Sequence, residues 1–250
     1  MVDKKGNHNP TKDLSLKRVI SSFSLRPRPV LVFFILNNLF IKNKSHTFVK
    51  NYQMKQSFKL FNFQGTPVYL SFWFFLLFLI FSVPVTVGIF ISVLLHEMGH
   101  AWMANRKGYS VYGITIDMLS GAAAIDSNMH DRDSISITAA GPLTTLMLAI
   151  SSYVLNLFVT NSFLTSLFII NTYLFIFNIL PIYPMDGGQI VRSYANLSKN
   201  RYQSRRIASI ISVIFSVLLV IYGLWTWSFI LAIFGGYFAY LSLKDLGFFK

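Results

Sequence analysis

The residues of this 250-residue chain best suited to chemistry are His96, Glu97 and His100, within the pentapeptide His-Glu-Met-Gly-His. Residues four apart lie on one face of a helix, so both imidazoles could bind the same metal ion. Glu97 is the only glutamate in the chain. It would lie beside that ion and could accept a proton from water bound there. The spacing therefore predicts a metal-dependent hydrolytic site.

A third metal ligand must come from elsewhere in the chain, because a catalytic zinc ion usually takes three protein ligands and one water. The chain has no cysteine and no second glutamate, which leaves His8, His46, His130 and the aspartates as candidates. We favour Asp186, because prolines precede it and two glycines follow it at the end of an apolar segment. The alternative is that Asp186 only caps the next helix.

Composition indicates that these residues lie in a membrane protein. The chain is 54% hydrophobic and 12% charged, whereas soluble domains usually carry about 25% charged residues. Several apolar runs are roughly 15 to 20 residues long, close to the length of a helix that crosses a bilayer. Ionisable side chains are costly inside such runs, so their presence there indicates a functional site.

We predict an all-α polytopic membrane protein with six membrane-spanning helices. The predicted spans cover residues 67–82, 85–104, 134–158, 162–180, 207–223 and 225–243. The histidine motif ends the second span, and Asp186 follows the fourth. Between the second and third spans, residues 109–116 have β-character and residues 120–124 are small. This stretch is too short to span, so it forms either a soluble loop or a re-entrant hairpin covered by protein or water.

The basic residues predict the orientation of the chain in the cell membrane. All 22 Lys and Arg residues lie before the first predicted span, after the second or fourth, or at the C-terminus. Basic loops stay in the cytoplasm, so both termini are predicted to be cytoplasmic. The net charge of +13 then reflects topology and not nucleic-acid binding. At about 1.5 Å per helical residue, the histidines lie roughly 9 to 15 Å below the cytoplasmic boundary.

The first 53 residues differ from the rest of the chain. They are rich in Lys, Asn and Ser, and the apolar stretch over residues 30–36 is too short to cross a membrane. We expect a basic, poorly ordered cytoplasmic arm over residues 1–53, followed by one six-span domain over residues 54–250. Met54 is a candidate alternative start, in which case the arm is not native coding sequence.

Two motifs together resemble the site-2 proteases, which are intramembrane zinc metalloproteases. The first is His-Glu-Met-Gly-His, and the second covers residues 178–188, where Met185 replaces the leucine of the family pattern NxxPxxPLDGG. The Ala-Gly-Pro sequence at residues 140–142 also resembles a family element. The resemblance covers residues 54–250 and implies a compact form without a PDZ or CBS domain. It further implies that residues 107–124 form a re-entrant hairpin.

The resemblance also implies the roles of individual residues. His96, His100 and Asp186 would hold one zinc ion, Glu97 would be the catalytic base, and Asn178 would lie near the substrate or the oxyanion. We expect the hairpin, which includes Gly121, to offer an edge to an extended substrate.

The substrates expected from the resemblance are single-span membrane proteins or remnant signal peptides, cut near the cytoplasmic side in regulated intramembrane proteolysis. The alternative is a membrane metal-binding or transport protein without peptidase activity. It is disfavoured because the acidic and histidine residues of the predicted spans gather in one cluster, whereas transporters carry ionisable groups along several spans.

Overall fold

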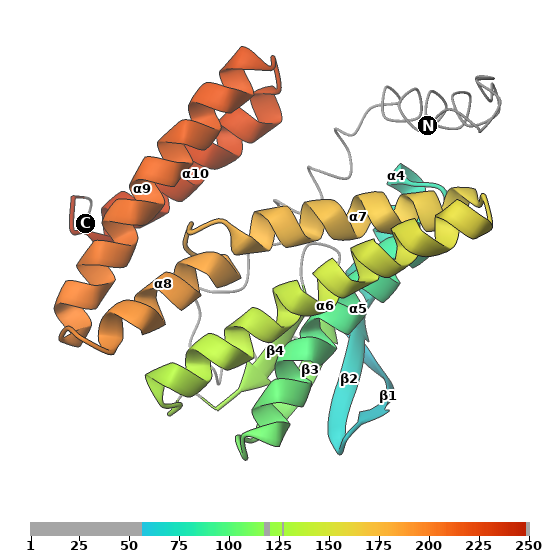
Figure 1. The fold of residues 1–250 in the computed structure, drawn as a ribbon, viewed down its shortest axis with the longest axis horizontal. Helices are drawn as coiled ribbons and strands as arrows, with labels where there is room; N and C mark the ends of the chain where they lie inside the picture. Colours follow the sequence, from blue (N-terminus) through green and yellow to red (C-terminus); the bar gives the residue numbers. More distant parts are fainter. Residues whose placement is uncertain (1–56, 118–120, 127, 249–250) are drawn as a thin grey trace, which may run out of the picture.

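The computed structural model describes residues 57–117, 121–126 and 128–248, which form several long helices and a small sheet (Figure 1). The elements are β1 (Ser57–Phe63), β2 (Thr66–Ser71), η1 (Phe72–Leu76), α4 (Leu77–Ile80), α5 (Val83–Arg106), β3 (Val111–Ile116), β4 (Gly121–Ile125), α6 (Asp131–Phe158), α7 (Ser162–Ile179), α8 (Asp186–Asn196), α9 (Arg201–Trp225) and α10 (Phe229–Asp245). The predictions for the arm at 1–53 and for Met54 lie outside the described residues.

Four helices of the described chain are long and apolar enough to cross a membrane, namely α5, α6, α7 and α9. They coincide with the second to fifth predicted spans, so those four predictions are confirmed as helices of the expected length. The sixth predicted span overlaps α10, which has 17 residues. At about 1.5 Å per residue that helix is some 25 Å long, slightly less than the roughly 30 Å of a hydrocarbon core.

The predicted helix over residues 67–82 is wrong. The chain there forms the strand β2 and then two short helices, η1 and α4. In β2, Thr66, Val68 and Leu70 are buried and alternate with partly buried Pro67 and Tyr69. This is the period of a strand. The pattern is hidden in the sequence because most residues on both faces are apolar.

This first segment nevertheless lies along most of the length of α5. At one end, the amide of Asn105 donates to the side-chain oxygen of Gln64 over 3.3 Å. At the other end, the hydroxyl of Thr86 donates to the carbonyl of Leu77 over 3.5 Å. A strand rises about 3.3 Å per residue, so β2 and the short helices cover this length with few residues.

The sheet corrects the all-α prediction, because it contains four strands in the order β1-β2-β3-β4. β1 and β2 are antiparallel, β2 and β3 are parallel, and β3 and β4 are antiparallel. Residues 109–124, predicted as a loop or hairpin, therefore include a hairpin that joins a larger sheet. The connection between the two parallel strands runs through η1, α4 and the long helix α5, and α5 packs against β3 and β4.

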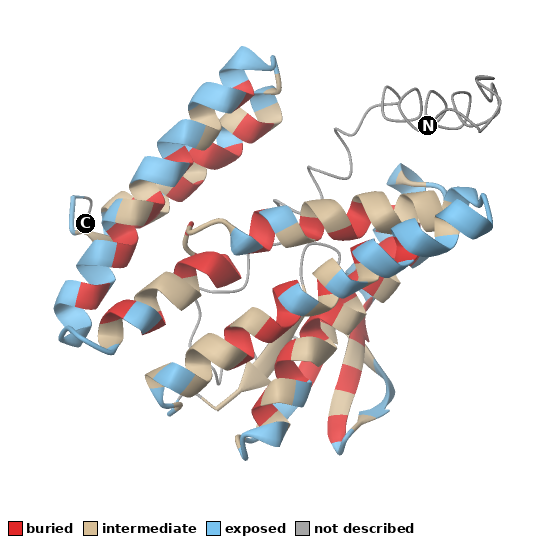
Figure 2. Ribbon diagram, in the orientation of Figure 1, coloured by how far each residue is buried: buried red, intermediate tan, exposed pale blue. Residues whose placement is uncertain are grey.

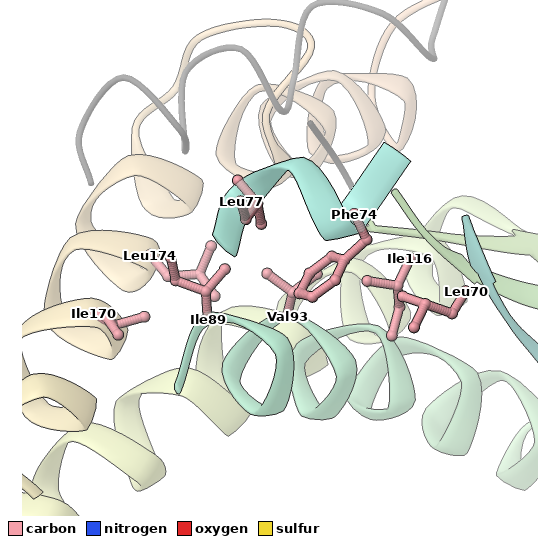
Figure 3. Packing of buried hydrophobic residues seen from close by; sticks show 8 residues of the cluster. All are labelled: Leu70, Phe74, Leu77, Ile89, Val93, Ile116, Ile170 and Leu174. Carbon is pink, nitrogen blue, oxygen red and sulfur yellow. The ribbon is translucent and has the colours of Figure 1, made fainter. Parts of the chain in front are cut away.

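A buried apolar cluster fixes α5 between the sheet side and α7 (Figure 3). Its members come from β2, η1, α4, α5, β3 and α7, and they are Leu70, Phe74, Leu77, Ile89, Val93, Ile116, Ile170 and Leu174. Because six elements contribute to one cluster, the depth and rotation of α5 are set by packing on two sides.

The helical hairpin of α9 and α10 is attached to this core through a second cluster. Phe177, Ile182 and Met185 pack there against Leu231, Phe234 and Phe238 of α10. Large apolar side chains elsewhere on α9 and on α6 are exposed. The ribbon of both helices has exposed segments along its length, coloured blue in Figure 2. Such surfaces suit contact with lipid rather than water.

Candidate metal centre

The helix α5 places His96, Glu97 and His100 together in a buried position. Their exposed fractions are 4%, 8% and 7%, which is unusual for ionisable side chains. The two Nε2 atoms lie 3.1 Å apart. One ligand atom from each of the three residues falls within 4.8 Å of the others, so the group could hold a metal ion.

Asp186 joins the two histidines from a distant part of the chain. Its Oδ2 atom lies 3.1 Å from Nε2 of His96 and 3.3 Å from Nε2 of His100. Asp186 is the first residue of α8 and is itself buried. Two imidazole nitrogens and one carboxylate oxygen therefore converge on one point.

The spacing of these three atoms fits a zinc ion. Zinc ligands of this type bind at about 2.0 to 2.2 Å in a tetrahedral arrangement, which separates any two of them by roughly 3.3 to 3.6 Å. The observed separations of 3.1, 3.1 and 3.3 Å are close to that range. Two nitrogens and one oxygen also leave a fourth position for water, as catalytic zinc sites do.

The two glycines after Asp186 explain how its carboxylate reaches this position. A Cβ at Gly187 would overlap the carbonyl oxygens of Ile179 and Leu180, and one at Gly188 would lie 2.6 Å from the carbonyl carbon of Ile182. Real Cβ atoms do not approach backbone so closely. The double glycine therefore allows α8 to begin directly against the end of α7.

His100 is held by a hydrogen bond from its second ring nitrogen. Nδ1 of His100 lies 2.8 Å from the carbonyl oxygen of Ile137 on α6. Since a carbonyl only accepts, Nδ1 carries the proton and Nε2 keeps its lone pair for a metal. This partner was not predicted from the sequence, because it is a backbone atom on another helix.

A glycine in α6 makes room for the imidazoles. A Cβ at Gly141 would overlap the ring of His100 and would lie 2.8 Å from Nε2 of His96. On the facing helix, a Cβ at Gly99 would overlap the hydroxyl of Thr144 and approach the carbonyl of Ala140 to 2.9 Å. The Ala-Gly-Pro motif thus lies directly against the candidate ligands. This contact explains why the motif needs a glycine, which spacing in the sequence does not reveal.

Gly121, at the start of β4, lies against Glu97. A Cβ there would come within 2.6 Å of Cγ and 2.9 Å of Oε1 of Glu97. In the described part of the chain, β4 pairs only with β3, so its other edge has no strand beside it. The hairpin edge and the candidate base are therefore neighbours.

Asn178 is buried near the end of α7, and its amide donates to the carbonyl of Leu174 over 3.0 Å. No hydrogen bond to the three candidate ligands is seen for it in the described residues, so a role at the oxyanion stays a prediction. His130 is exposed and caps α6, where its Nδ1 accepts from the backbone of Arg132. His8 and His46 lie outside the described residues.

Comparison with known proteins finds relatives of one kind. The model of "Peptidase family M50" matches residues 84–161 and 157–222. A zinc metalloprotease of Methanocaldococcus jannaschii, MJ0392, is 28% identical over 195 residues, which cover 71% of this chain and 57% of the relative. The chain thus spans little more than half the length of that relative. A solved structure, the site-2 protease from the same organism, matches with a TM-score of 0.56 and 25% identity, over 76% of this chain and 94% of that one.

Proposed function

The chain belongs to peptidase family M50, and from this premise we propose that it is a zinc-dependent endopeptidase that cuts membrane-spanning segments of other proteins. The observation that carries the proposal is the convergence of His96, His100 and Asp186 beside Glu97, at the end of a helix that is apolar enough to span. Charged and polar groups are costly at such a position, so their presence there indicates a functional site.

The proposed chemistry divides between the ligands and Glu97. His96, His100 and Asp186 would hold zinc, which lowers the pKa of a bound water to about 7 and polarises the scissile carbonyl. Glu97 accepts the proton of the attacking water and returns it to the leaving amine. Its place one residue after His96 on α5 supports this role.

Other residues assist by position. The hydrogen bond from Nδ1 of His100 to the carbonyl of Ile137 keeps Nε2 of the imidazole oriented toward the proposed zinc position. We propose that Asn178, buried near the end of α7, donates the second N–H of its amide to the oxyanion that develops on the substrate, since its amide already donates once to the carbonyl of Leu174.

We propose that the substrate binds as an extended strand at the open edge of β4. A membrane-spanning helix has its carbonyls hydrogen-bonded, so it must unwind before attack. A free strand edge supplies replacement hydrogen bonds for the unwound segment. The absence of a side chain at Gly121 allows that edge to reach Glu97.

The site would face the cytoplasm. Six crossings follow if β2, η1 and α4 cross the bilayer beside α5, and if α10 crosses as well. All Lys and Arg residues outside β1 would then lie on one side, together with both termini. Lys59 of β1 lies beside Tyr69 of β2. We propose a multi-pass protein of the cell membrane, with one such domain over residues 54–250, whose substrates are single-span proteins or remnant signal peptides cut in their cytoplasmic halves.

Co-expression with a panel of single-span proteins tests this function. The wild-type chain should release a fragment from at least one of them, and Glu97→Gln should lower its release by about 100- to 10,000-fold while keeping zinc. Fragments released equally by both chains would reject Glu97 as the base. Zinc binding without any fragment across the panel would favour a metal-binding protein.

A further inference from the structure

Two buried polar atoms close to the metal centre have no hydrogen-bond partner in the described part of the chain. They are Nδ1 of His96 and Oδ1 of Asn171. Asn171 is fully buried on α7, and His96 is almost fully buried on α5. An unpaired polar group is costly to bury, so each of these atoms needs a partner.

The two residues belong to facing rows of the same helix pair. Along α5, positions 88, 92 and 96 follow each other at intervals of four and share one face. A Cβ at Gly88 would lie 3.1 Å from Ile170 of α7, and the amide of Asn171 donates to the hydroxyl of Ser92 over 2.9 Å. His96 is the next position of this row, one turn beyond Ser92.

The existing hydrogen bonds determine what each atom can do. Nδ2 of Asn171 donates both to Ser92 and to the carbonyl of Leu167, and the hydroxyl of Ser92 donates to the carbonyl of Gly88. A flipped amide would place its oxygen against the carbonyl of Leu167, so Oδ1 of Asn171 is the acceptor that remains.

His96 has the complementary requirement. Its Nε2 faces Asp186 and His100 and must keep its lone pair if it binds zinc. Nδ1 must then carry the proton and needs an acceptor. His96, whose donor lacks an acceptor, therefore lies one helical turn along α5 from Ser92, and Ser92 is the partner of Asn171, whose acceptor lacks a donor.

We propose that Asn171 is a positioning residue for His96, and that Nδ1 of His96 reaches Oδ1 of Asn171 through one buried water molecule. The chain of hydrogen bonds then runs from His96 through the water to Asn171, Ser92 and the carbonyl of Gly88. It holds His96 in the tautomer that presents Nε2 to the metal, as the carbonyl of Ile137 does for His100. This inference rests on the proposed zinc site.

Zinc affinity of the purified full-length protein, measured by competition with a chelator, tests the inference without any substrate. Asn171→Leu should weaken zinc binding by about 10- to 100-fold, the usual effect of losing such a partner. Asn171→Asp keeps an acceptor oxygen and should bind zinc more tightly than the Leu variant. The matched control is Asn156→Leu, which loses the hydrogen bonds of Asn156 to Thr165 and Asn161 at the far end of α6.

Comparison with the control separates a positioning role from a structural one. Equal zinc affinities in Asn171→Leu and Asn156→Leu, with cleavage retained by the wild type, would overturn the inference and leave the proposed function standing. Weaker zinc binding by Asn171→Leu than by the control, together with a wild-type protein that cuts no substrate, would support the inference and reject the peptidase function. A wild type that binds no zinc would overturn both.

A second measurement does not depend on the folding of a variant. A high-resolution map of the zinc-loaded wild-type protein should show one water within hydrogen-bonding distance of both Nδ1 of His96 and Oδ1 of Asn171. A map that shows no water between these two atoms would overturn the proposal.

Discussion

Two imidazoles can share one point in this protein because position 141 carries no side chain. Gly141 brings the backbone of α6 against His96 and His100, and a methyl group there would occupy the space of the His100 ring. At the residue scale, the centre therefore depends as much on what is missing from α6 as on the groups that α5 provides.

Gly141→Ala should consequently abolish zinc binding or weaken it severely. The added methyl group must displace the ring of His100 or move α6, and overpacking of this kind also costs about 1 to 3 kcal/mol of stability. The control is Gly236→Ala in α10, where a Cβ meets nothing within 4 Å. Elemental analysis and chelator competition measure the outcome, and equal zinc affinity in the two variants would contradict the account.

The carboxylate of Asp186 gives a second prediction at this scale. Asp186→Ala removes one of three proposed ligands, so zinc affinity should fall by more than the roughly 10- to 100-fold cost of losing an outer partner. Asp126→Ala is a suitable control, because among the described residues the carboxylate of Asp126 accepts only from the backbone of Asn128 in the loop after β4. Full zinc occupancy in the Asp186 variant, measured by elemental analysis, would remove it from the ligand set.

Much of the centre could be predicted from the sequence, but not its packing. His96 and His100 are four residues apart, so helical geometry alone places them together. Asp186 lies 86 residues beyond His100 in the sequence, and only its flanking motif and its predicted side of the membrane pointed to it. The contacts of Gly141 and Ile137 depend on how two helices pack, which local spacing does not encode.

At the scale of elements, the strand β4 connects the metal centre to the sheet. Its first residue, Gly121, contacts Glu97, and its outer edge is open in the described part of the chain. A residue that both borders the base and begins an open edge can determine how a bound strand lies relative to the attacking water.

Gly121→Ala should therefore reduce cleavage while leaving zinc in place. The new methyl group would displace the side chain of Glu97, and an error of about 1 Å in such a group can lower the rate roughly 100-fold. Gly113→Ala in β3 provides the matched control, because its Cβ would make only ordinary contacts of 3.6 Å or more. Cleavage of a reporter is the measurement, and equal rates in the two variants would argue against this placement of Glu97.

The elements also show where sequence patterns fail. The helices α5, α6, α7 and α9 were predictable, because long apolar runs have few other stable forms in a membrane. β2 was not, because Pro67 and Tyr69 on its second face are only partly buried and offer no polar contrast with Val68. Its pairing with β3, more than 40 residues away, is a tertiary contact that hydropathy does not report.

For the whole molecule, the proposed function requires that the metal centre and all basic loops share one side of the membrane. The chain contains no cysteine, so single-cysteine variants report topology without background. Lys199→Cys, between α8 and α9, should react with an impermeant thiol reagent only from the cytoplasmic side. Thr160→Cys, between α6 and α7, should react only from the opposite side. Labelling of both positions from the same side would contradict the proposed orientation.

The central claim is that zinc held by His96, His100 and Asp186 lets this chain cut a peptide bond within a membrane-spanning segment. The most direct test is to reconstitute the purified protein with single-span substrates and to map the cut bond by mass spectrometry. The account predicts a bond in the cytoplasmic half of the span, cut only with zinc present and not by Glu97→Gln. A cut outside the span, or one that persists after zinc removal, would contradict it.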